Sequence, residues 1–216
     1  AAYQPNPVWL AEQLASIAAQ THTEWICMIT LDSPLEEIRS SPDLASFMHD
    51  ARFVWVENPE RLGVRSNFQK ATQLLLERDV DLIAFSDQDD VWLPQKLARA
   101  VEVLSRDGTG LYFSDLQAWD GQDGMLGTVR KATPLAARDH LLGGGSAGCT
   151  YVMSAAFFAH LKARFAAVDL GGVRRISHDW IIYFLARHDG FGVSPSPDAL
   201  IHYRIHPDSQ YGGMSL

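Results

Sequence analysis

The feature that most constrains this chain is an apolar run that ends abruptly in three closely spaced carboxylates. The run Leu82–Ser86 has the length and composition of a buried strand, and Asp87, Asp89 and Asp90 follow it directly. Carboxylates this close together repel one another and resist joint ionisation. A divalent cation removes that conflict, because hard cations take oxygen ligands. We therefore favour a strand that ends at a metal site over two alternatives, a solvated loop and a helix cap at Asp90.

Composition and charge limit the class of protein and its partners. The 216 residues suffice for one sizeable domain, and the composition is that of an ordinary soluble globular chain. A formal net charge of -8 argues against broad binding of nucleic acid, so an anionic ligand needs a metal or a few local basic residues. Cys27 and Cys149 stand far apart in apolar settings, which indicates inert thiols and a reducing compartment. We expect neither a membrane-spanning helix nor a signal peptide.

Strand and helix patterns alternate through residues 1–115. Helical spacing of apolar residues predicts helices that begin at Pro7, near Ser66 and at Pro94, with a shorter one over 40–50. The predicted strands are 25–31, 53–56, 82–86 and 110–114. Such alternation favours a mostly parallel central sheet flanked by helices, Rossmann-like in this first half. Ligands of open α/β sheets bind beyond the carboxyl ends of the strands, where the acids after residue 86 lie.

Residues 116–216 have a different character. A Gly/Asp turn at 120–124 indicates a hairpin, and the glycine-rich stretch 143–148 lacks the spacing of a phosphate-binding loop. A strand at 151–153 and helices at 155–165 and from His178 onward follow. Asp179 opens the last of these helices, where a carboxylate serves either as a cap or as a base. The segment from 201 alternates like a strand, so one of its faces is formed by His202, Arg204 and His206. That face either reaches a ligand or faces solvent.

Two more charged residues stand where a nucleotide or phosphate ligand would meet them. Asp32 follows an apolar run, where it either contacts a ligand or caps the turn made with Ser33 and Pro34. Arg65 lies at the start of a helix, and helix N-termini attract anions while the Arg fork suits phosphate. The alternative for Arg65 is a solvated surface charge.

Together these residues resemble family 2 glycosyltransferases of the GT-A fold, the bacterial rhamnosyltransferase-like branch especially. The most specific stretch is 86–97, Ser-Asp-Gln-Asp-Asp-Val-Trp-Leu-Pro-Gln-Lys-Leu, which resembles the family's metal-binding D-x-D region. Further resemblances lie at Tyr3 with 12–21, at 58–68, at 178–180 and at 203–206. The resemblance covers nearly the whole chain and implies a single GT-A domain over 1–216, with a nucleotide-sugar half (1–115) and an acceptor half (116–216).

The resemblance also implies an activity and a set of roles. The activity is metal-dependent, inverting transfer of a sugar from dTDP-rhamnose or a UDP-sugar to a saccharide or lipid-linked acceptor in surface-polysaccharide synthesis. Asp89, Asp87 and His206 would hold Mg²⁺ or Mn²⁺, and Asp179 would deprotonate the acceptor hydroxyl. The residues that would contact the donor are Tyr3, Asp32, Arg65, Asp87 and Asp89. The implied setting is cytoplasmic, with peripheral contact at the inner membrane face.

Two rival interpretations remain open at this point. The stretch Asp87–Val91 also fits the D-x-D-x-[TV] pattern of haloacid-dehalogenase-type phosphatases, in which Asp87 is the nucleophile and Asp89 the acid/base. No later acidic pair of the kind that family needs is evident. A non-catalytic nucleotide- or glycan-binding domain is the second rival, because Leu31 stands where the resembled family usually has an acid beside Asp32. The reaction product distinguishes the three interpretations: a glycosyltransferase releases nucleoside diphosphate, a phosphatase releases inorganic phosphate, and a binding domain releases neither.

Overall fold

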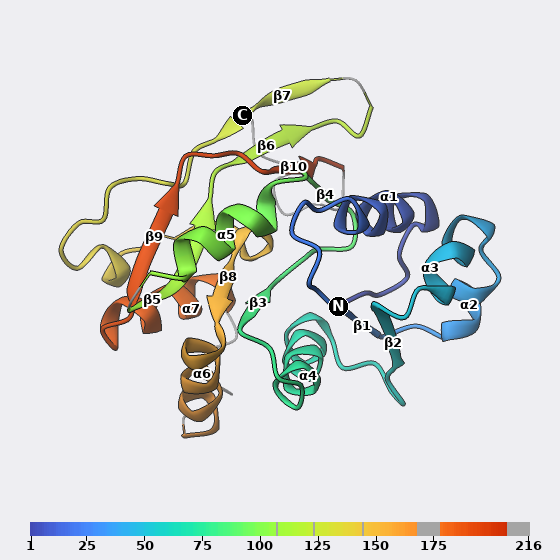
Figure 1. Ribbon diagram of the computed structural model, residues 1–216, viewed down its shortest axis with the longest axis horizontal. Helices are drawn as coiled ribbons and strands as arrows, with labels where there is room; N and C mark the ends of the chain where they lie inside the picture. Colours follow the sequence, from blue (N-terminus) through green and yellow to red (C-terminus); the bar gives the residue numbers. More distant parts are fainter. Residues whose placement is uncertain (107, 123, 144, 168–177, 207–216) are drawn as a thin grey trace.

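The computed structural model describes residues 1–106, 108–122, 124–143, 145–167 and 178–206 (Figure 1).

The first helix begins where its capping residues predict. Helix α1 (Pro7–Ala18) starts after Asn6, whose Oδ1 accepts hydrogen bonds from the amides of Val8 at 3.0 Å and Trp9 at 3.3 Å. Pro7 occupies the first helical position, which suits its missing N–H.

Helices and strands then alternate through the first half, as the sequence predicts. The strands are β1 (Cys27–Leu31), β2 (Phe53–Glu57), β3 (Leu82–Ala84), β4 (Val91–Trp92) and β5 (Thr109–Ser114). The helices are α2 (Leu35–Arg39), α3 (Ala45–His49), α4 (Val64–Leu76) and α5 (Lys96–Leu104). The predicted helix over 40–50 is a 3₁₀ turn, Pro42–Leu44, that continues into α3.

The second half adds a hairpin, two helices and three strands. The turn predicted at 120–124 joins β6 (Leu116–Trp119) to β7 (Met125–Val129) as an antiparallel pair. Short 3₁₀ turns at Asp139–Leu141 and Gly148–Thr150 lead to β8 (Val152–Ser154). The chain continues through α6 (Ala155–Ala167), α7 (His178–His188), β9 (Gly192–Ser196) and β10 (Ile201–Arg204).

The described strands form three small sheets rather than one mostly parallel sheet. Strands β1 and β2 pair in parallel, and the other two sheets have the orders β4-β10-β6-β7 and β3-β8-β5-β9. Both of the larger sheets mix parallel and antiparallel pairs: β8 lies between β3 and β5, and β10 lies between β4 and β6. The parallel pairing predicted for the first half is confirmed for β1 and β2, the two larger sheets are mixed rather than mostly parallel, and helices cover the sheets as expected (Figure 1).

A cavity of about 670 Å³ lies between β1 and β3. Its walls are largely apolar, with Ile29, Phe68 and Ile83 among them, and Asp87 lines it from residues 85–90 between β3 and β4, which form the acidic turn. Beside it, Ala2 forms an isolated parallel bridge with Leu31, so the first residues run alongside β1. In the part of the chain that the structure describes, no helix has the length and hydropathy needed to cross a membrane.

Candidate functional site

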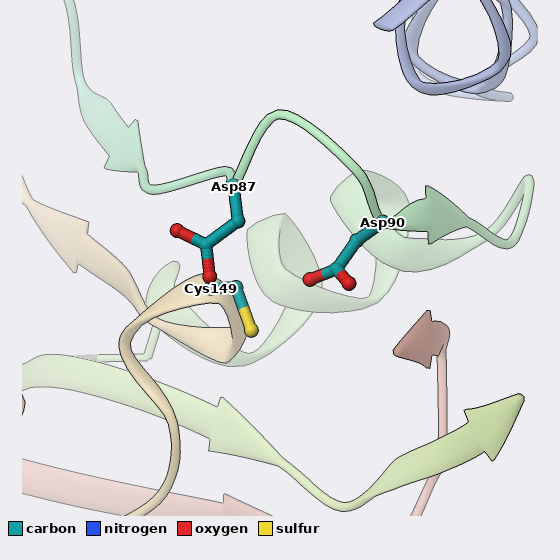
Figure 2. A group of neighbouring side chains, drawn as sticks. All are labelled: Asp87, Asp90 and Cys149. Carbon is teal, nitrogen blue, oxygen red and sulfur yellow. The ribbon is translucent and has the colours of Figure 1, made fainter. Parts of the chain in front are cut away.

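The turn between β3 and β4 carries the three predicted acids, and their side chains point in two different directions. Asp87 and Asp90 point toward Cys149, which lies in the 3₁₀ turn before β8 (Figure 2). The ligand atoms of these three side chains all lie within 4.8 Å of one another. Asp89 has a different partner, because its Oδ2 lies 2.9 Å from Nε2 of His206. The structure thus brings Asp89 and His206 together, as expected, and adds Asp90 and Cys149 beside Asp87.

Burial and mutual repulsion disfavour the ionised forms of Asp87 and Asp90 in this turn. Burial raises the pKa of Asp87 to about 6, and the charge of Asp89 adds to the shift. Burial also raises the pKa of Asp90 well above its ordinary value, with further contributions from Asp87 and Asp89. Among the described residues, Oδ2 of Asp90 has no hydrogen-bond partner. Carboxylate oxygens and an imidazole at such a turn suit Mg²⁺ or Mn²⁺, so the residues present fit the implied metal.

Two buried residues beside the acids were not predicted as part of the site. Cys149 is a free thiol, and burial raises its pKa well above the ordinary value, so it stays protonated. Lys96 is 1% exposed, and its Nζ lies 4.0 Å from the ring centroid of Trp92. Burial lowers the pKa of Lys96 to about 8, while the charges of Cys149 and Asp90 act in the opposite direction. A signal for Lys96 was present, since it shares the buried face of α5 with Ala100.

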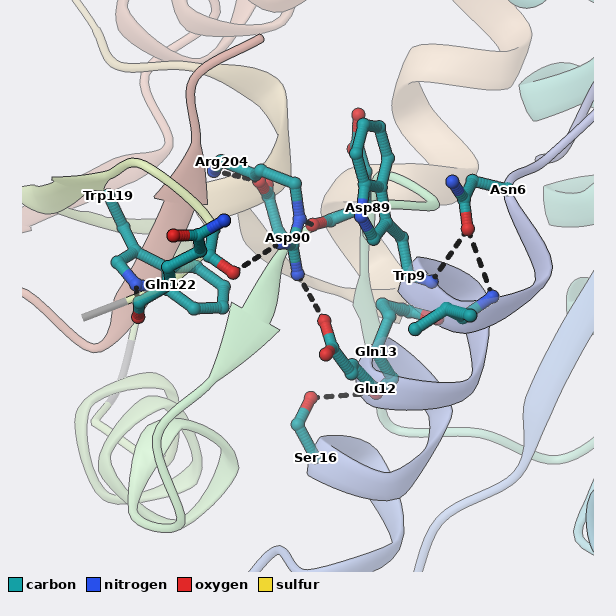
Figure 3. A network of polar contacts seen from close by, with 12 residues as sticks. Asn6, Trp9, Glu12, Gln13, Ser16, Asp89, Asp90, Trp119, Gln122 and Arg204 are labelled. Atoms are coloured by element: carbon teal, nitrogen blue, oxygen red, sulfur yellow. Dashed lines mark hydrogen bonds and ion pairs between the residues drawn. The ribbon is translucent and has the colours of Figure 1, made fainter. Parts of the chain in front are cut away.

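Arg204 is a second residue whose role the sequence analysis left open. The alternative of a solvent-facing strand face is wrong for Arg204, because only 3% of the residue is exposed. Its guanidinium carbon lies 4.3 Å from the ring centroid of Trp119 and 5.0 Å from that of Trp9. Its backbone amide donates to Oδ1 of Asp90 at 3.1 Å (Figure 3). Strand β10 is therefore tied directly to the acidic turn.

Asp32 is satisfied by the protein itself. Its carboxylate accepts hydrogen bonds from Nδ2 of Asn58 at 2.7 Å and from the amides of Leu62 at 3.1 Å and Gly63 at 2.8 Å. Burial acts to raise the pKa of Asp32, but these hydrogen bonds and the charge of Arg61 outweigh it and hold the pKa below its ordinary value. Asp32 thus anchors the loop that enters α4, rather than capping its own turn.

Tyr3 lies beside the acidic turn, whereas Arg65 is only partly placed. The backbone amide of Tyr3 donates to Oε1 of Gln88 at 2.9 Å, and Nε2 of Gln88 donates to the Tyr3 carbonyl at 3.3 Å. Tyr3 as a residue is 36% exposed, and the guanidinium carbon of Arg61 lies 4.0 Å from the centroid of its ring. Arg65 occupies the first turn of α4, as predicted, but its side chain lies outside the described residues.

Asp179 lies near enough to Asp87 to affect its electrostatics. It stands in the first turn of α7, where its Oδ1 accepts from the amide of Trp180 at 2.9 Å, and its carbonyl accepts from the Tyr151 hydroxyl at 3.2 Å. Its charge is among the influences that raise the pKa of Asp87, after burial and Asp89. Asp179 is therefore an electrostatic neighbour of Asp87 although the two are far apart in the sequence.

Comparison with known proteins decides the family. Residues 2–165 match the family model described as glycosyl transferase family 2. The chain belongs to this family. Over 206 residues it is 25% identical to "dTDP-rhamnosyl transferase RfbG" of Shigella flexneri, an alignment that covers 94% of this chain and 71% of the relative. The rhamnosyltransferase-like resemblance is thereby confirmed.

Solved structures confirm the predicted α/β fold of the GT-A class. The chain superposes on S. aureus TarS 1–349 in complex with UDP with a TM-score of 0.68 and 13% identity, covering 97% of this chain and 61% of that one. Against the mannosyltransferase PcManGT from Pyrobaculum calidifontis, in complex with GDP-Man and Mn²⁺, the TM-score is 0.59 at 13% identity. That alignment covers 98% of this chain and 57% of PcManGT, so this chain spans less than two thirds of these structures.

Proposed function

We propose that this protein catalyses metal-dependent, inverting transfer of a sugar from a nucleoside-diphosphate donor to a saccharide or lipid-linked acceptor. The observation that carries the proposal is the acidic turn, in which Oδ2 of Asp89 lies 2.9 Å from Nε2 of His206 and the ligand atoms of Asp87, Asp90 and Cys149 lie within 4.8 Å of one another. Family membership and the rhamnosyl transferase relative support dTDP-rhamnose as donor, and the UDP-bound fold relative supports a UDP-sugar. Surface-polysaccharide synthesis is the process we infer.

The donor side of the site is assigned from the turn outward. Asp87, Asp89 and His206 would hold Mg²⁺ or Mn²⁺, which as a Lewis acid supplies stabilisation of the charge that develops on the leaving diphosphate. The Mn²⁺-bound mannosyltransferase of similar fold supports this choice of metal. Tyr3, 36% exposed beside the turn, offers its ring to the nucleotide base. Asp32 borders the same region, because its carboxylate holds the loop that precedes α4.

Arg65 and the helix that carries it complete the proposed donor contacts. Arg65 stands in the first turn of α4, where the positive end of the helix dipole and a guanidinium both favour a diphosphate. Residues 1–115 would thus bind the donor, and residues 116–216, which supply Asp179, would bind the acceptor.

Asp179 is the proposed general base. A carboxylate within hydrogen-bond reach of the acceptor hydroxyl takes its proton as the new glycosidic bond forms. Because Asp179 lies near Asp87 but belongs to another element, it does not need to serve as a metal ligand. Attack on the face opposite the leaving diphosphate inverts the anomeric centre in one displacement, without a covalent intermediate. A lipid-linked acceptor would place this work at the cytoplasmic face of the inner membrane.

The rival interpretations differ in what the acids do. In a phosphatase Asp87 would attack phosphorus, but here Asp87 faces Asp90 and Cys149, and the family assignment favours transfer. A non-catalytic binder remains the second candidate, because Asp32, one of the proposed base contacts, already has three protein donors.

Calorimetric titration with UDP and with dTDP, each with and without Mn²⁺, tests the proposal. We expect metal-dependent binding in the wild type that Asp89→Ala abolishes, and the preferred nucleotide narrows the donor. Release of nucleoside diphosphate in the presence of acceptor then separates a transferase from a binder. Absence of nucleotide binding by correctly folded wild-type protein contradicts the assignment.

A further inference from the structure

The guanidinium of Arg204 connects segments that are far apart in the chain (Figure 3). Its Nε donates to the carbonyl oxygen of Asp89 at 2.9 Å and its Nη1 to the carbonyl oxygen of Gly121 at 3.3 Å. Its Nη2 forms an ion pair with Oε2 of Glu12 on α1. Together with the bond from its own amide to Asp90, Arg204 joins α1, the acidic turn, the β6–β7 hairpin tip and β10.

The surroundings of this guanidinium keep it in one orientation. Its side chain is 2% exposed, against 43% for Glu12, and the rings of Trp9 and Trp119 both lie within cation–π distance. The Arg fork is planar and always charged, so each hydrogen bond fixes the direction of the others. A lysine at this position would present a point charge and could not reproduce the fork.

These contacts bear directly on the proposed metal ligands. Arg204 holds the backbone of Asp89 and the carboxylate of Asp90, while two residues later His206 meets the side chain of Asp89. Both partners of the Asp89–His206 contact are thus positioned by the same residue. We propose that Arg204 is a positioning residue of the metal site, which aligns Asp89 with His206 and couples their geometry to the hairpin tip. This inference rests on the proposed metal-dependent function.

Gly121 offers a way to disturb Arg204 without changing any charged group. Its φ is +86°, and a Cβ added there would lie 2.5 Å from Nη1 of Arg204. The methyl group added by Gly121→Ala at the hairpin tip should therefore displace the guanidinium of Arg204. Gly108 provides the matched control, because its φ is +76° and an added Cβ meets nothing within 4 Å. Both substitutions carry similar backbone strain, but only one reaches Arg204.

The test measures binding of the preferred nucleoside diphosphate as a function of Mn²⁺ concentration in the wild type, Arg204→Gln, Gly121→Ala and Gly108→Ala. Residues that orient metal ligands typically change metal affinity roughly 10- to 100-fold when substituted, and we expect the Mn²⁺ midpoint to rise by that factor in Arg204→Gln and Gly121→Ala. Saturating Mn²⁺ should restore full binding. If Arg204 had only a structural role, the substitutions would lower the fraction of protein that binds nucleotide and leave the Mn²⁺ midpoint unchanged. That result would overturn the inference.

Hydrogen exchange of the metal-free proteins separates this inference from the proposed function. We expect faster exchange over residues 85–92 in Arg204→Gln and Gly121→Ala than in Gly108→Ala. If the wild type binds no nucleotide, the proposed function is wrong. If hydrogen exchange at the acidic turn is the same in the variants as in the wild type, the positioning role of Arg204 is wrong. If Arg204→Gln does not fold, Gly121→Ala, which retains the arginine, decides both measurements.

Discussion

Asp32 and Asp87 occupy comparable places, each just beyond the carboxyl end of a strand, yet their electrostatic environments are opposite. Asp32 follows β1 and receives three hydrogen bonds that hold its pKa below the ordinary value. Asp87 follows β3, and burial together with the charge of Asp89 raises its pKa to about 6. An acid after a strand is therefore not in itself a ligand site. The distinguishing property is whether the protein already supplies the donors that its charge requires.

The difference also explains how the two regions can cooperate. Asp32 stabilises the loop from Asn58 to Gly63 and so sets the start of α4, at the entrance to the proposed donor site. In the acidic turn, burial and the neighbouring carboxylates disfavour the ionised forms of Asp87 and Asp90, which the proposed cation would stabilise. Asp32 is satisfied by the protein itself and Asp87 is not, and substitutions at these two acids, after one at Asp179, examine that difference.

The largest effect is expected for an acid that belongs to neither group. Asp179→Asn removes the proposed base, and since general-base catalysis typically contributes 10²- to 10⁴-fold, turnover should fall by about that factor. Affinity for the nucleoside diphosphate should stay unchanged, because Asp179 is not a proposed donor contact. Initial rates and calorimetry on the same preparations check both expectations, with Asp43→Asn on the exposed 3₁₀ turn as control. A proportional loss of binding would show that Asp179 belongs to the donor site instead.

A smaller effect, on stability, is expected at Asp32. Asp32→Ala leaves the amides of Leu62 and Gly63 without their acceptor, whereas Nδ2 of Asn58 loses one of two and still donates to Oδ1 of Asn67. Each hydrogen bond to a charged acceptor contributes about 1.5–3 kcal/mol, but solvent can reach part of this loop, so we expect the free energy of unfolding to fall by roughly 2–3 kcal/mol in total. Urea denaturation measures it. Unchanged stability would remove the contrast between the two acids.

The smallest effect has the opposite sign. The folded-state pKa of Asp87, about 6, lies above the 3.8 of an unperturbed Asp, so the folded protein binds this proton more tightly. The ionised carboxylate thus costs stability above pH 6, and the cost disappears below about pH 4, where both states are protonated. The pKa difference of about 2 units corresponds to about 3 kcal/mol, and burial of the Asn amide without full hydrogen bonding offsets part of it. Asp87→Asn should therefore stabilise the metal-free protein by about 1–2 kcal/mol at pH 8 and by less at pH 5, and saturating Mn²⁺ should reverse that advantage. Destabilisation by Asp87→Asn at pH 8 without metal would contradict an uncompensated charge.

Local signals predicted most of the elements. Asn6 and Pro7 fix the start of α1 because cap chemistry is local, and the Gly/Asp turn at 120–124 marks a hairpin for the same reason. Two strands escaped prediction: β4 has two residues, and β9 contains Pro195, which weakens any strand pattern. The sheet directions failed because β8 pairs antiparallel with both β3 and β5, a long-range choice that periodicity does not encode.

The site divides in the same way. The Asp87 and Asp89 pattern was visible because it follows an apolar run, and the contact of Asp89 with His206 followed from family resemblance. The burial of Arg204 was not predictable, since a charged residue on an alternating strand ordinarily faces solvent and its partners Glu12 and Gly121 are distant in sequence. Cys149 passed as an inert thiol because only folding brings it beside the acids.

The position of Trp9 makes its intrinsic fluorescence sensitive to changes around Arg204 and His206. Its ring lies against the guanidinium of Arg204 and, at 5.1 Å between centroids, against the imidazole of His206. Any movement of His206 toward a metal therefore changes the polarity and the quenching groups around one particular indole. Comparison of the intrinsic emission of the wild type and Trp9→Phe would isolate this signal from the other tryptophans. The occupancy of the site then becomes measurable in real time, without a label and without turnover.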